Sequence, residues 1–317
     1  EPTVFPKVVP LVLEEEIDHE KITKAAAIWS TSTRKMVLVG TLPPHTISKK
    51  YLEILANDPS VLVFTETTSN LRDDKFFNKI DQMILPIEKN EAMLDEFQPE
   101  ILLTLGGMIV SKKVKAILRK RQPAHHWHIH ENRVYDTFFC LEHFFKMNPN
   151  HFFELFFAQT KPIESSYKSY WNVIKQARQK KHEVYLEQVP FTDLKAFEAI
   201  LASLPTSLIL HLGNSSTVRY AQLFEIDSSV ELFCNRGTSG IDGSTSTAIG
   251  TSVVAEKQTL LITGDLSFLY DSNALWNNYI PKNFRIILVN NNGGGIFRIL
   301  PGNKNTENFD TYFETIH

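Results

Sequence analysis

Short continuous runs of apolar residues recur along this chain, and stretches with helical spacing separate them. In the first half, the runs that predict buried strands cover residues 35–40, 61–65, 100–105 and 124–129. Between these runs, residues 47–56 and 114–119 place apolar side chains at the spacing of one helix face. Strands that alternate with helices are typical of a parallel sheet with helices on its faces. We therefore expect a Rossmann-like domain over residues 1–160.

The same alternation returns in the second half. The predicted strands there cover residues 207–213, 231–235, 259–265 and 285–292. Residues 244–256 are rich in small side chains and are expected to be helical. The polar and aromatic stretch 161–188 predicts a connecting helix, and a new helix is expected to begin after Thr192 as its N-cap. The whole pattern predicts an α/β protein with two Rossmann-like, doubly wound parallel-sheet domains, the second over residues 189–317.

Composition narrows the class of protein. The 317 residues suit two domains, and 43% hydrophobic with 22% charged residues is ordinary for a globular chain. Because no apolar run approaches the ~18 residues of a membrane helix, we expect no membrane span. Cys140 and Cys234 are too few for a disulfide scaffold, which favours the cytoplasm. The net charge of −3 argues against nucleic acid as a partner, although local Arg and Lys side chains still allow an anionic substrate.

Polar side chains follow two of the predicted strands directly. Gly264-Asp265-Leu266-Ser267 ends one run, and the segment 290–295, Asn-Asn-Asn-Gly-Gly-Gly, ends the next. Ligands of open α/β sheets bind at this carboxyl edge. The Asp265 carboxylate, the Asn291 amide oxygen and the Gly293 carbonyl form a hard-oxygen set suited to Mg²⁺ and a diphosphate, which Ser267 and the Gly264 turn could also contact. The alternative is an ordinary helix N-cap and a turn asparagine.

These clusters resemble the signature of thiamine-diphosphate (ThDP) enzymes, which begins with Gly-Asp and ends with Asn-Asn at this spacing. Leu266 stands where most of those enzymes have Gly. That departure, together with segments 213–219, 235–243 and 270–275, resembles the 2-succinyl-5-enolpyruvyl-6-hydroxy-3-cyclohexene-1-carboxylate (SEPHCHC) synthases of menaquinone biosynthesis. The resemblance is dense over residues 207–301 and thin before them. It implies a fragment that covers the middle domain and most of a C-terminally truncated diphosphate-binding domain.

The resemblance also implies roles for individual residues. ThDP would contact Ile241, Gly264, Asp265, Leu266, Ser267, Asn291, Gly293 and Ile296. Mg²⁺, with Mn²⁺ as an alternative, would be held by Asp265, Asn291 and Gly293. Ile241 would hold the cofactor bent, so that the cofactor removes its own C2 proton. Substrates would contact Ser215, Arg219, Arg236, Lys112, Lys113, Phe297 and Leu300.

The reaction that the resemblance implies is a carboligation. 2-Oxoglutarate would be decarboxylated, and its succinyl-semialdehyde unit would be added to isochorismate. Both substrates carry carboxylates, which Arg side chains match bidentately. The activating Glu of this family belongs to a domain outside this chain and acts across the interface of a homodimer or homotetramer. We therefore assign no catalytic residue here and expect the chain alone to be inactive.

Other interpretations remain open at this stage. Another ThDP decarboxylase, or an enzyme like acetolactate synthase, is possible in principle, although Leu266, Arg219 and Arg236 weigh against it. A non-catalytic nucleotide-binding module is a third hypothesis, weakened by the absence of a G-x-G-x-x-G pattern in the first domain. Lys112 and Lys113 could be a plain surface helix start. Strand alternation puts His126, His128 and His130 on one face, but one strand rarely supplies three zinc ligands.

Overall fold

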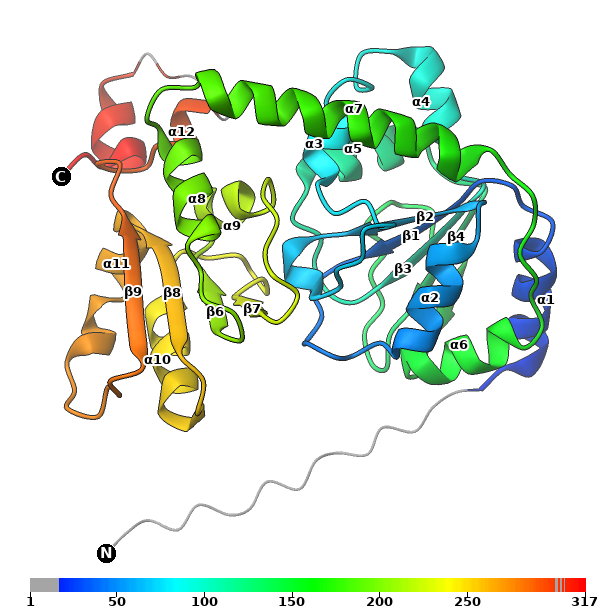
Figure 1. The fold of residues 1–317 in the computed structure, drawn as a ribbon, viewed down its shortest axis with the longest axis horizontal. Helices are drawn as coiled ribbons and strands as arrows, with labels where there is room; N and C mark the ends of the chain where they lie inside the picture. Colours follow the sequence, from blue (N-terminus) through cyan, green and yellow to red (C-terminus); the bar gives the residue numbers. More distant parts are fainter. Residues whose placement is uncertain (1–16, 300–301, 303, 305) are drawn as a thin grey trace, which may run out of the picture.

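The computed structural model describes residues 17–299, 302, 304 and 306–317. Two lobes lie side by side, and the long helix α7 (Tyr167–Gln188) runs along both of them (Figure 1). Each lobe is built on an all-parallel sheet. The predicted fold class is therefore confirmed. Among the described residues, no helix is both long and apolar enough to cross a bilayer.

The first sheet has the strand order β2-β1-β3-β4-β5. Its strands are β1 (Lys35–Val39), β2 (Val61–Thr65), β3 (Ile101–Leu105), β4 (His125–Ile129) and β5 (His143–Phe145). β1, β2 and β3 are buried along their whole length, because helices cover both faces. The sequence pattern did not predict β5, which is only three residues long and half-buried at its start.

Two apolar clusters fill the faces of this sheet. One packs Trp29 of α1 (His19–Trp29) against Trp127 and Phe156, with α2 (Lys49–Asn57) and α6 (Pro149–Phe157) beside them. The other contains Phe97 and Trp171, whose rings meet edge to face at 5.2 Å between centroids. It is covered by α3 (Ile80–Ile84), α4 (Glu91–Phe97), α5 (Lys112–Lys120) and the start of α7. Trp171 thus anchors the connecting helix on the first lobe.

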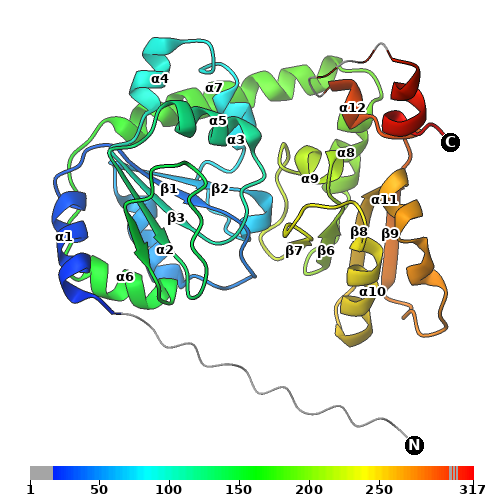
Figure 2. The same cartoon turned by 180° about the vertical axis from the view of Figure 1, so that it is seen from behind.

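The second sheet has the order β7-β6-β8-β9 (Figure 2). Its strands are β6 (Ile209–Leu212), β7 (Glu231–Cys234), β8 (Thr259–Gly264) and β9 (Phe284–Val289), each within the range predicted from the sequence or one residue beyond it. The surrounding elements are α8 (Asp193–Ala202), α9 (Ser216–Ala221), α10 (Ser244–Val254), α11 (Asp265–Tyr270), η2 (Ser272–Leu275), α12 (Ile296–Ile299) and η3 (Phe309–Glu314). Thr192 holds the expected N-cap position of α8, but its side chain makes no capping hydrogen bond.

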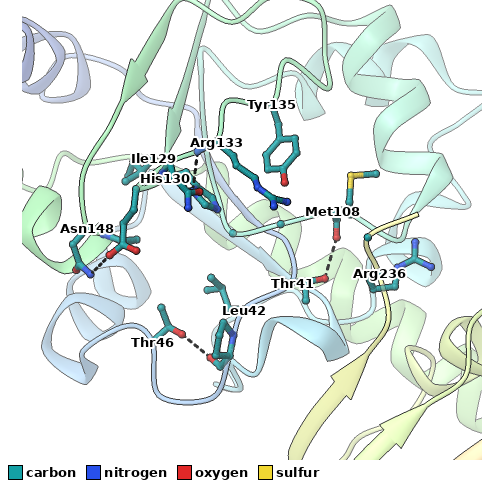
Figure 3. A pocket seen from close by; sticks show the side chains of 17 residues that line it. Thr41, Leu42, Thr46, Met108, Ile129, His130, Arg133, Tyr135, Asn148 and Arg236 are labelled. Carbon is teal, nitrogen blue, oxygen red and sulfur yellow. Dashed lines mark hydrogen bonds between the residues drawn. The ribbon is translucent and has the colours of Figure 1, made fainter. Parts of the chain in front are cut away.

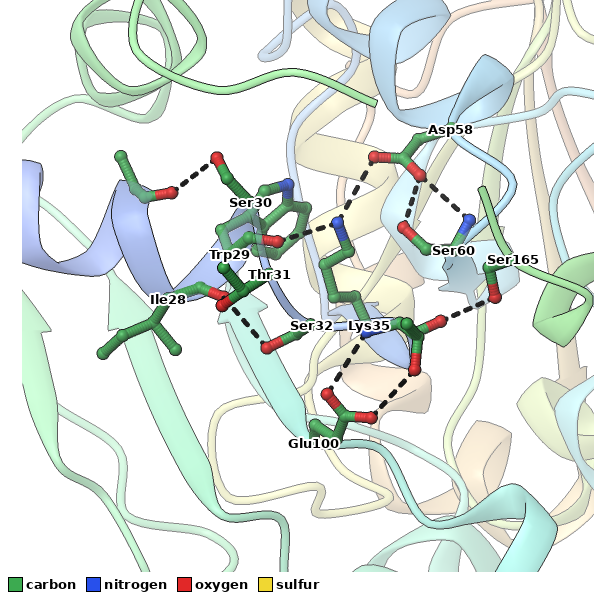
Figure 4. A network of polar contacts seen from close by, with 12 residues as sticks. Ile28, Trp29, Ser30, Thr31, Ser32, Lys35, Asp58, Ser60, Glu100 and Ser165 are labelled. Carbon is green, nitrogen blue, oxygen red and sulfur yellow. Dashed lines mark hydrogen bonds and ion pairs between the residues drawn. The ribbon is translucent and has the colours of Figure 1, made fainter. Parts of the chain in front are cut away.

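A buried ion pair ties elements together at the amino end of the first sheet (Figure 4). Lys35 at the start of β1 is fully buried, and its Nζ donates to the Trp29 carbonyl at 3.0 Å. The same Nζ lies 3.5 Å from the Asp58 carboxylate, which also accepts from the Ser60 amide at 2.9 Å. Burial lowers the pKa of Lys35, and Asp58 opposes that shift. This network joins α1, β1 and the end of α2, far from the carboxyl edge where ligands bind.

Candidate functional site

The two polar clusters identified in the sequence meet at the carboxyl edge of the second sheet. β8 and β9 are neighbours, and Gly264 pairs with Val289 in register. Asp265 follows Gly264 as the first residue of α11, and Asn291 follows shortly after β9. The parallel register therefore brings the two segments together, as their positions after two neighbouring strands predict. β8 is buried as its apolar run indicates, but β9 is only partly buried because it lies at the edge of the sheet.

Asp265 links the two strand ends directly. The residue is 4% exposed. One carboxylate oxygen accepts from the Leu266 amide at 2.7 Å, and the other accepts from the Gly293 amide at 2.9 Å. Gly293 has a φ of +128°, and a Cβ there would lie 2.4 Å from the Glu314 carbonyl, so only glycine fits this turn.

The Asn291 amide is held on one side only. Its Nδ2 donates to the Asp193 carboxylate at 2.8 Å, which fixes the orientation of the amide plane. Its Oδ1 is buried and has no hydrogen-bond partner in the part of the chain that the structure describes. A buried acceptor without a partner costs free energy. A carboxylate beside an unpaired amide oxygen is a donor set that fits a hard cation such as Mg²⁺.

The Gly293 carbonyl can complete this set. It accepts a hydrogen bond from the Gly295 amide at 2.9 Å, and a carbonyl oxygen has a second lone pair. The three oxygen donors named from the sequence thus belong to one group of residues at one edge of the sheet. The fit to a divalent cation rests on the unpaired Asn291 Oδ1 and on the anionic Asp265.

A cavity of about 320 Å³ opens at this edge. All eight residues expected to contact a cofactor line it: Ile241, Gly264, Asp265, Leu266, Ser267, Asn291, Gly293 and Ile296. Ser215 and Phe297, expected at a substrate, line it too. The Ser267 hydroxyl donates to the Ile241 carbonyl at 2.5 Å, which joins the loop after β7 to the start of α11.

The two arginines lie beside this cavity and not in its lining. Arg219 donates to the Ser215 carbonyl at 2.5 Å, and burial together with nearby Arg236 lowers its pKa. Arg236 is 8% exposed and donates through Nη1 to the Asn214 Oδ1 at 2.8 Å. Its Nε is buried without a hydrogen-bond partner among residues 17–299, 302, 304 and 306–317. A buried guanidinium with an unused N–H can donate a hydrogen bond to an anionic ligand group.

Lys112 and Lys113 begin α5 in the first lobe, and neither lines the 320 Å³ cavity. Lys112 is exposed, and the Lys113 ammonium is paired with Glu88 at 2.7 Å. The structure therefore does not bring these lysines to the cavity. Leu300 lies outside the described residues.

A residue that the sequence analysis did not single out organises the end of β7. The Asn214 Nδ2 donates to the carbonyls of Asn235 and Gly240, both at 2.7 Å, while its Oδ1 accepts from Arg236. Asn214 is 3% exposed, so these bonds are sheltered from water. Its position directly after the β6 strand, next to Ser215, was the available signal.

A second cavity, of about 480 Å³, lies at the carboxyl ends of β1, β3 and β4 (Figure 3). Thr41, Met108, His130 and Arg133 line it from the first lobe, and Arg236 reaches it from the second. Because β1 and β3 are adjacent but point their connections to opposite sides, this is the switch point of the first sheet. Arg236 therefore lies between the two cavities.

Of the three histidines that the alternation puts on one face, His126 and His128 lie in the core, whereas His130 follows β4, is half-buried and lines the 480 Å³ cavity. The Thr104 hydroxyl lies 3.0 Å from His126 Nε2 and 2.9 Å from His128 Nδ1. Burial lowers the pKa of both rings to about 4. Within the described residues, no three His, Cys, Asp or Glu side chains are grouped so as to hold a metal ion. The zinc hypothesis therefore has no support in the structure.

The fold and this edge define a class: doubly wound α/β proteins with an oxygen-lined ligand site at the carboxyl ends of the second sheet. No family model matches the chain. It is 56% identical over 314 residues to the SEPHCHC synthase of Christiangramia forsetii. This match covers 98% of this chain and 54% of the relative. It is 55% identical over 289 residues to the SEPHCHC synthase of Flavobacterium psychrophilum, covering 91% of this chain and 52% of the relative. It is 52% identical over 318 residues to the SEPHCHC synthase of Flavobacterium johnsoniae, and this match covers 99% of this chain and 57% of the relative.

The chain belongs to the family of the SEPHCHC synthases. It spans about half the length of the curated relatives it matches. The resemblance stated from the sequence is therefore confirmed at the level of the family.

Proposed function

We propose that this chain supplies the metal- and diphosphate-binding half of a ThDP-dependent SEPHCHC synthase. The observation that carries the proposal is that Asp265 and the buried, unpartnered Asn291 Oδ1 follow adjacent strands, and both residues line one cavity. The printed name of the relatives supports the reaction class. The alternatives, another ThDP decarboxylase or a nucleotide-binding module, have no comparable support.

Asp265, Asn291 and the Gly293 carbonyl would hold Mg²⁺, and diphosphate oxygens with water would complete its octahedron. Mn²⁺ would accept the same oxygen ligands. Ile241, on the loop that Ser267 fixes, would support the bent cofactor, and Ile296 with Phe297 would form an apolar wall that excludes water. When bound, ThDP supplies the electron sink for decarboxylation. Gly264 and Leu266 would contact it through the turn that opens α11.

Arg219 and Arg236 would bind the carboxylates of 2-oxoglutarate and isochorismate, with Ser215 at the cavity wall. Their mutual proximity makes a local positive field in a chain whose net charge is −3. Lys112 and Lys113 are weaker candidates, because Lys113 is already paired with Glu88. Leu300 stays in the proposal on the resemblance alone.

The activating Glu is proposed to come from a part of the protein outside this chain, across a homodimer or homotetramer interface. We also propose a cytoplasmic setting, in keeping with two free cysteines, Cys140 and Cys234. Asp265 and Asn291 alone would bind the metal without performing the chemistry, so the chain by itself is expected to be inactive.

Thermal melting with and without ligand tests the proposal. ThDP with Mg²⁺ should raise the melting temperature of the full-length protein, because a ligand that binds only the native state stabilises it. ThDP with EDTA should not, and NAD should have no effect. Protection by NAD and not by ThDP would support the nucleotide-binding module instead. Turnover of pyruvate in preference to 2-oxoglutarate would support a different ThDP decarboxylase.

A further inference from the structure

The edge strand β7 of the second sheet is completed by a side chain from the first lobe. β7 has a strand neighbour on one side only, β6. On its free side, the Leu232 amide donates to Asn70 Oδ1 at 2.8 Å, and Asn70 Nδ2 donates to the Leu232 carbonyl at 2.8 Å. One amide side chain thus makes the pair of hydrogen bonds that another strand would make.

Asn70 is held rigidly where it stands. It ends the η1 turn (Thr67–Ser69) in the left-handed region, with a φ of 52°, which asparagine tolerates better than most residues. Its Nδ2 also donates to the Leu42 carbonyl at 2.8 Å, in the loop after β1. Beside it, Arg72 donates to the Val230 carbonyl at 2.9 Å. Only a carboxamide supplies both the acceptor and the two donors that these bonds require.

The other end of the same turn holds the segment before α5. The Glu66 carboxylate accepts from the Val110 and Ser111 amides, both at 2.7 Å. Val110 is 2% exposed and packs in the apolar cluster of the second lobe together with Leu232. Burial raises the pKa of Glu66 to about 7, and the hydrogen bonds from the Val110 and Ser111 amides oppose that shift, with a smaller contribution from nearby Arg236. The segment 66–70, which we call the clasp, therefore bonds to the β1 loop, the α5 loop and β7.

β7 carries this restraint to Arg236. The strand runs from Glu231 to Cys234, and Arg236 follows two residues later. Its guanidinium is bonded to Asn214 and lies at the junction of the two cavities. A shift of β7 against the first lobe would move Arg236 with it. The two hydrogen bonds between Asn70 and Leu232 oppose such a shift.

We propose that Asn70 is a positioning residue for Arg236: by bonding both backbone groups of Leu232 it fixes the strand from which the carboxylate-binding arginine extends. This inference rests on the proposed function. Asn70 lines neither of the two cavities described above, so its role would be expressed in substrate affinity through Arg236 and not in cofactor binding.

The test compares Asn70→Ala with Asn78→Ala in the full-length protein. Asn78 is a matched control, because its Nδ2 also bonds across the lobes, to Glu225 at 3.0 Å, but not to β7. Asn70→Ala should raise KM for 2-oxoglutarate roughly tenfold, which lies within the range of coupling energies between residues of one hydrogen-bond network. ThDP affinity should be unchanged, and Asn78→Ala should leave both values unchanged. Equal KM values in the two variants would overturn the inference.

A double-mutant cycle separates this inference from the proposed function. If Arg236→Ala alone leaves KM for 2-oxoglutarate unchanged, the proposed role of Arg236 fails. If Arg236→Ala raises KM and Asn70→Ala adds its own full effect to it, Arg236 stands and the positioning role of Asn70 fails. The inference expects the second substitution to add little once the first is present. Should Asn70→Ala not fold, Asn70→Asp keeps the acceptor and loses the donors, and the same comparison applies.

Hydrogen exchange gives a readout that is independent of activity. The Leu232 amide should exchange faster in Asn70→Ala than in the wild type, because its acceptor is gone. It should be unaffected in Asn78→Ala. Unchanged protection of the Leu232 amide in Asn70→Ala would also overturn the inference.

Discussion

Arg219 and Arg236 are the residues on which the substrate side of the account depends. Arg236 follows β7 by two residues and is itself 8% exposed with an unused Nε, which is an expensive place for an idle charge. Arg219 is bonded only to the Ser215 carbonyl among the described contacts. Both can therefore offer donors to a carboxylate.

Arg219→Ala and Arg236→Ala should each lower kcat/KM for 2-oxoglutarate by roughly 10- to 100-fold, because a charge-assisted hydrogen bond contributes about 1.5–3 kcal/mol. ThDP affinity should change little. Arg285→Ala is the control, since Arg285 bonds to Lys282 and Phe284 carbonyls at the opposite end of β9. Kinetics with 2-oxoglutarate that match the wild type in both variants would show that these arginines are structural.

At the scale of elements, the buried histidines predict an acid-sensitive fold. Burial lowers the folded-state pKa of His126, His128 and His211 to about 4, from an ordinary value of 6.5. As the pH falls below 6.5, the unfolded chain takes up protons that the folded chain refuses. The stability that these rings contribute is therefore complete above pH 6.5 and is lost as the pH falls toward 4.

His211→Phe should flatten this dependence. His211 is 4% exposed, stacks on Phe233 at 5.5 Å, and has no partner for Nε2 in the described structure. Urea unfolding at pH 7 and at pH 5 measures the free energy of unfolding. The decrease in the free energy of unfolding from pH 7 to pH 5 should be smaller in His211→Phe than in the wild type by about 1–2 kcal/mol, since each unit of pKa shift corresponds to 1.36 kcal/mol. An equal loss would show that His211 is not buried as a neutral ring.

The stability that an ion pair contributes should depend on whether the pair is buried, as between Lys35 and Asp58, or exposed. Lys35→Ala should destabilise the fold by about 3–5 kcal/mol, because it leaves the Asp58 charge buried without its partner. Lys49→Ala removes an exposed pair with Glu53 and should change stability by no more than about 0.5 kcal/mol. Thermal or urea unfolding of the two variants gives the comparison. Similar values for both would mean that the Lys35 pair is solvated.

The sequence predicts most elements of this fold because the apolar runs of parallel strands leave a local signal. The run 259–265 and the run 285–292 became β8 and β9, and their polar ends fell on one edge because parallel strands share it. β5 was not predicted because a strand of three residues, of which only the last is buried, leaves no such pattern. The roles of Asn70 and Glu66 were not predicted for another reason. Their hydrogen bonds reach residues distant in sequence, such as Leu232 and Val110, and no local spacing indicates such contacts. The pairing of Lys113 with Glu88 is also non-local, and a substrate contact of Lys112 and Lys113 stays a prediction.

At the scale of the whole molecule, the two lobes are joined by hydrogen bonds at β7, and Arg236 lies between their two cavities. The clasp of the first lobe is hydrogen-bonded to β7, and the second lobe contains Asp265, Asn291 and Arg236. The chain spans about half the length of its curated relatives, so a cofactor that also needs the other half would be held only in part. For this reason the decisive test uses the full-length protein.

The central claim is that Asp265 and Asn291 bind the metal that anchors the diphosphate. Calorimetric titration of ThDP in the presence of Mg²⁺ measures this directly for the wild type, Asp265→Ala, Asn291→Ala and the control Asn290→Ala, whose exposed side chain bonds only to the Asn292 amide among the described contacts. The account predicts wild-type affinity for Asn290→Ala, and no Mg²⁺-dependent binding for Asp265→Ala or Asn291→Ala while circular dichroism shows an intact fold. ThDP affinity that is unchanged in Asp265→Ala and Asn291→Ala would contradict it.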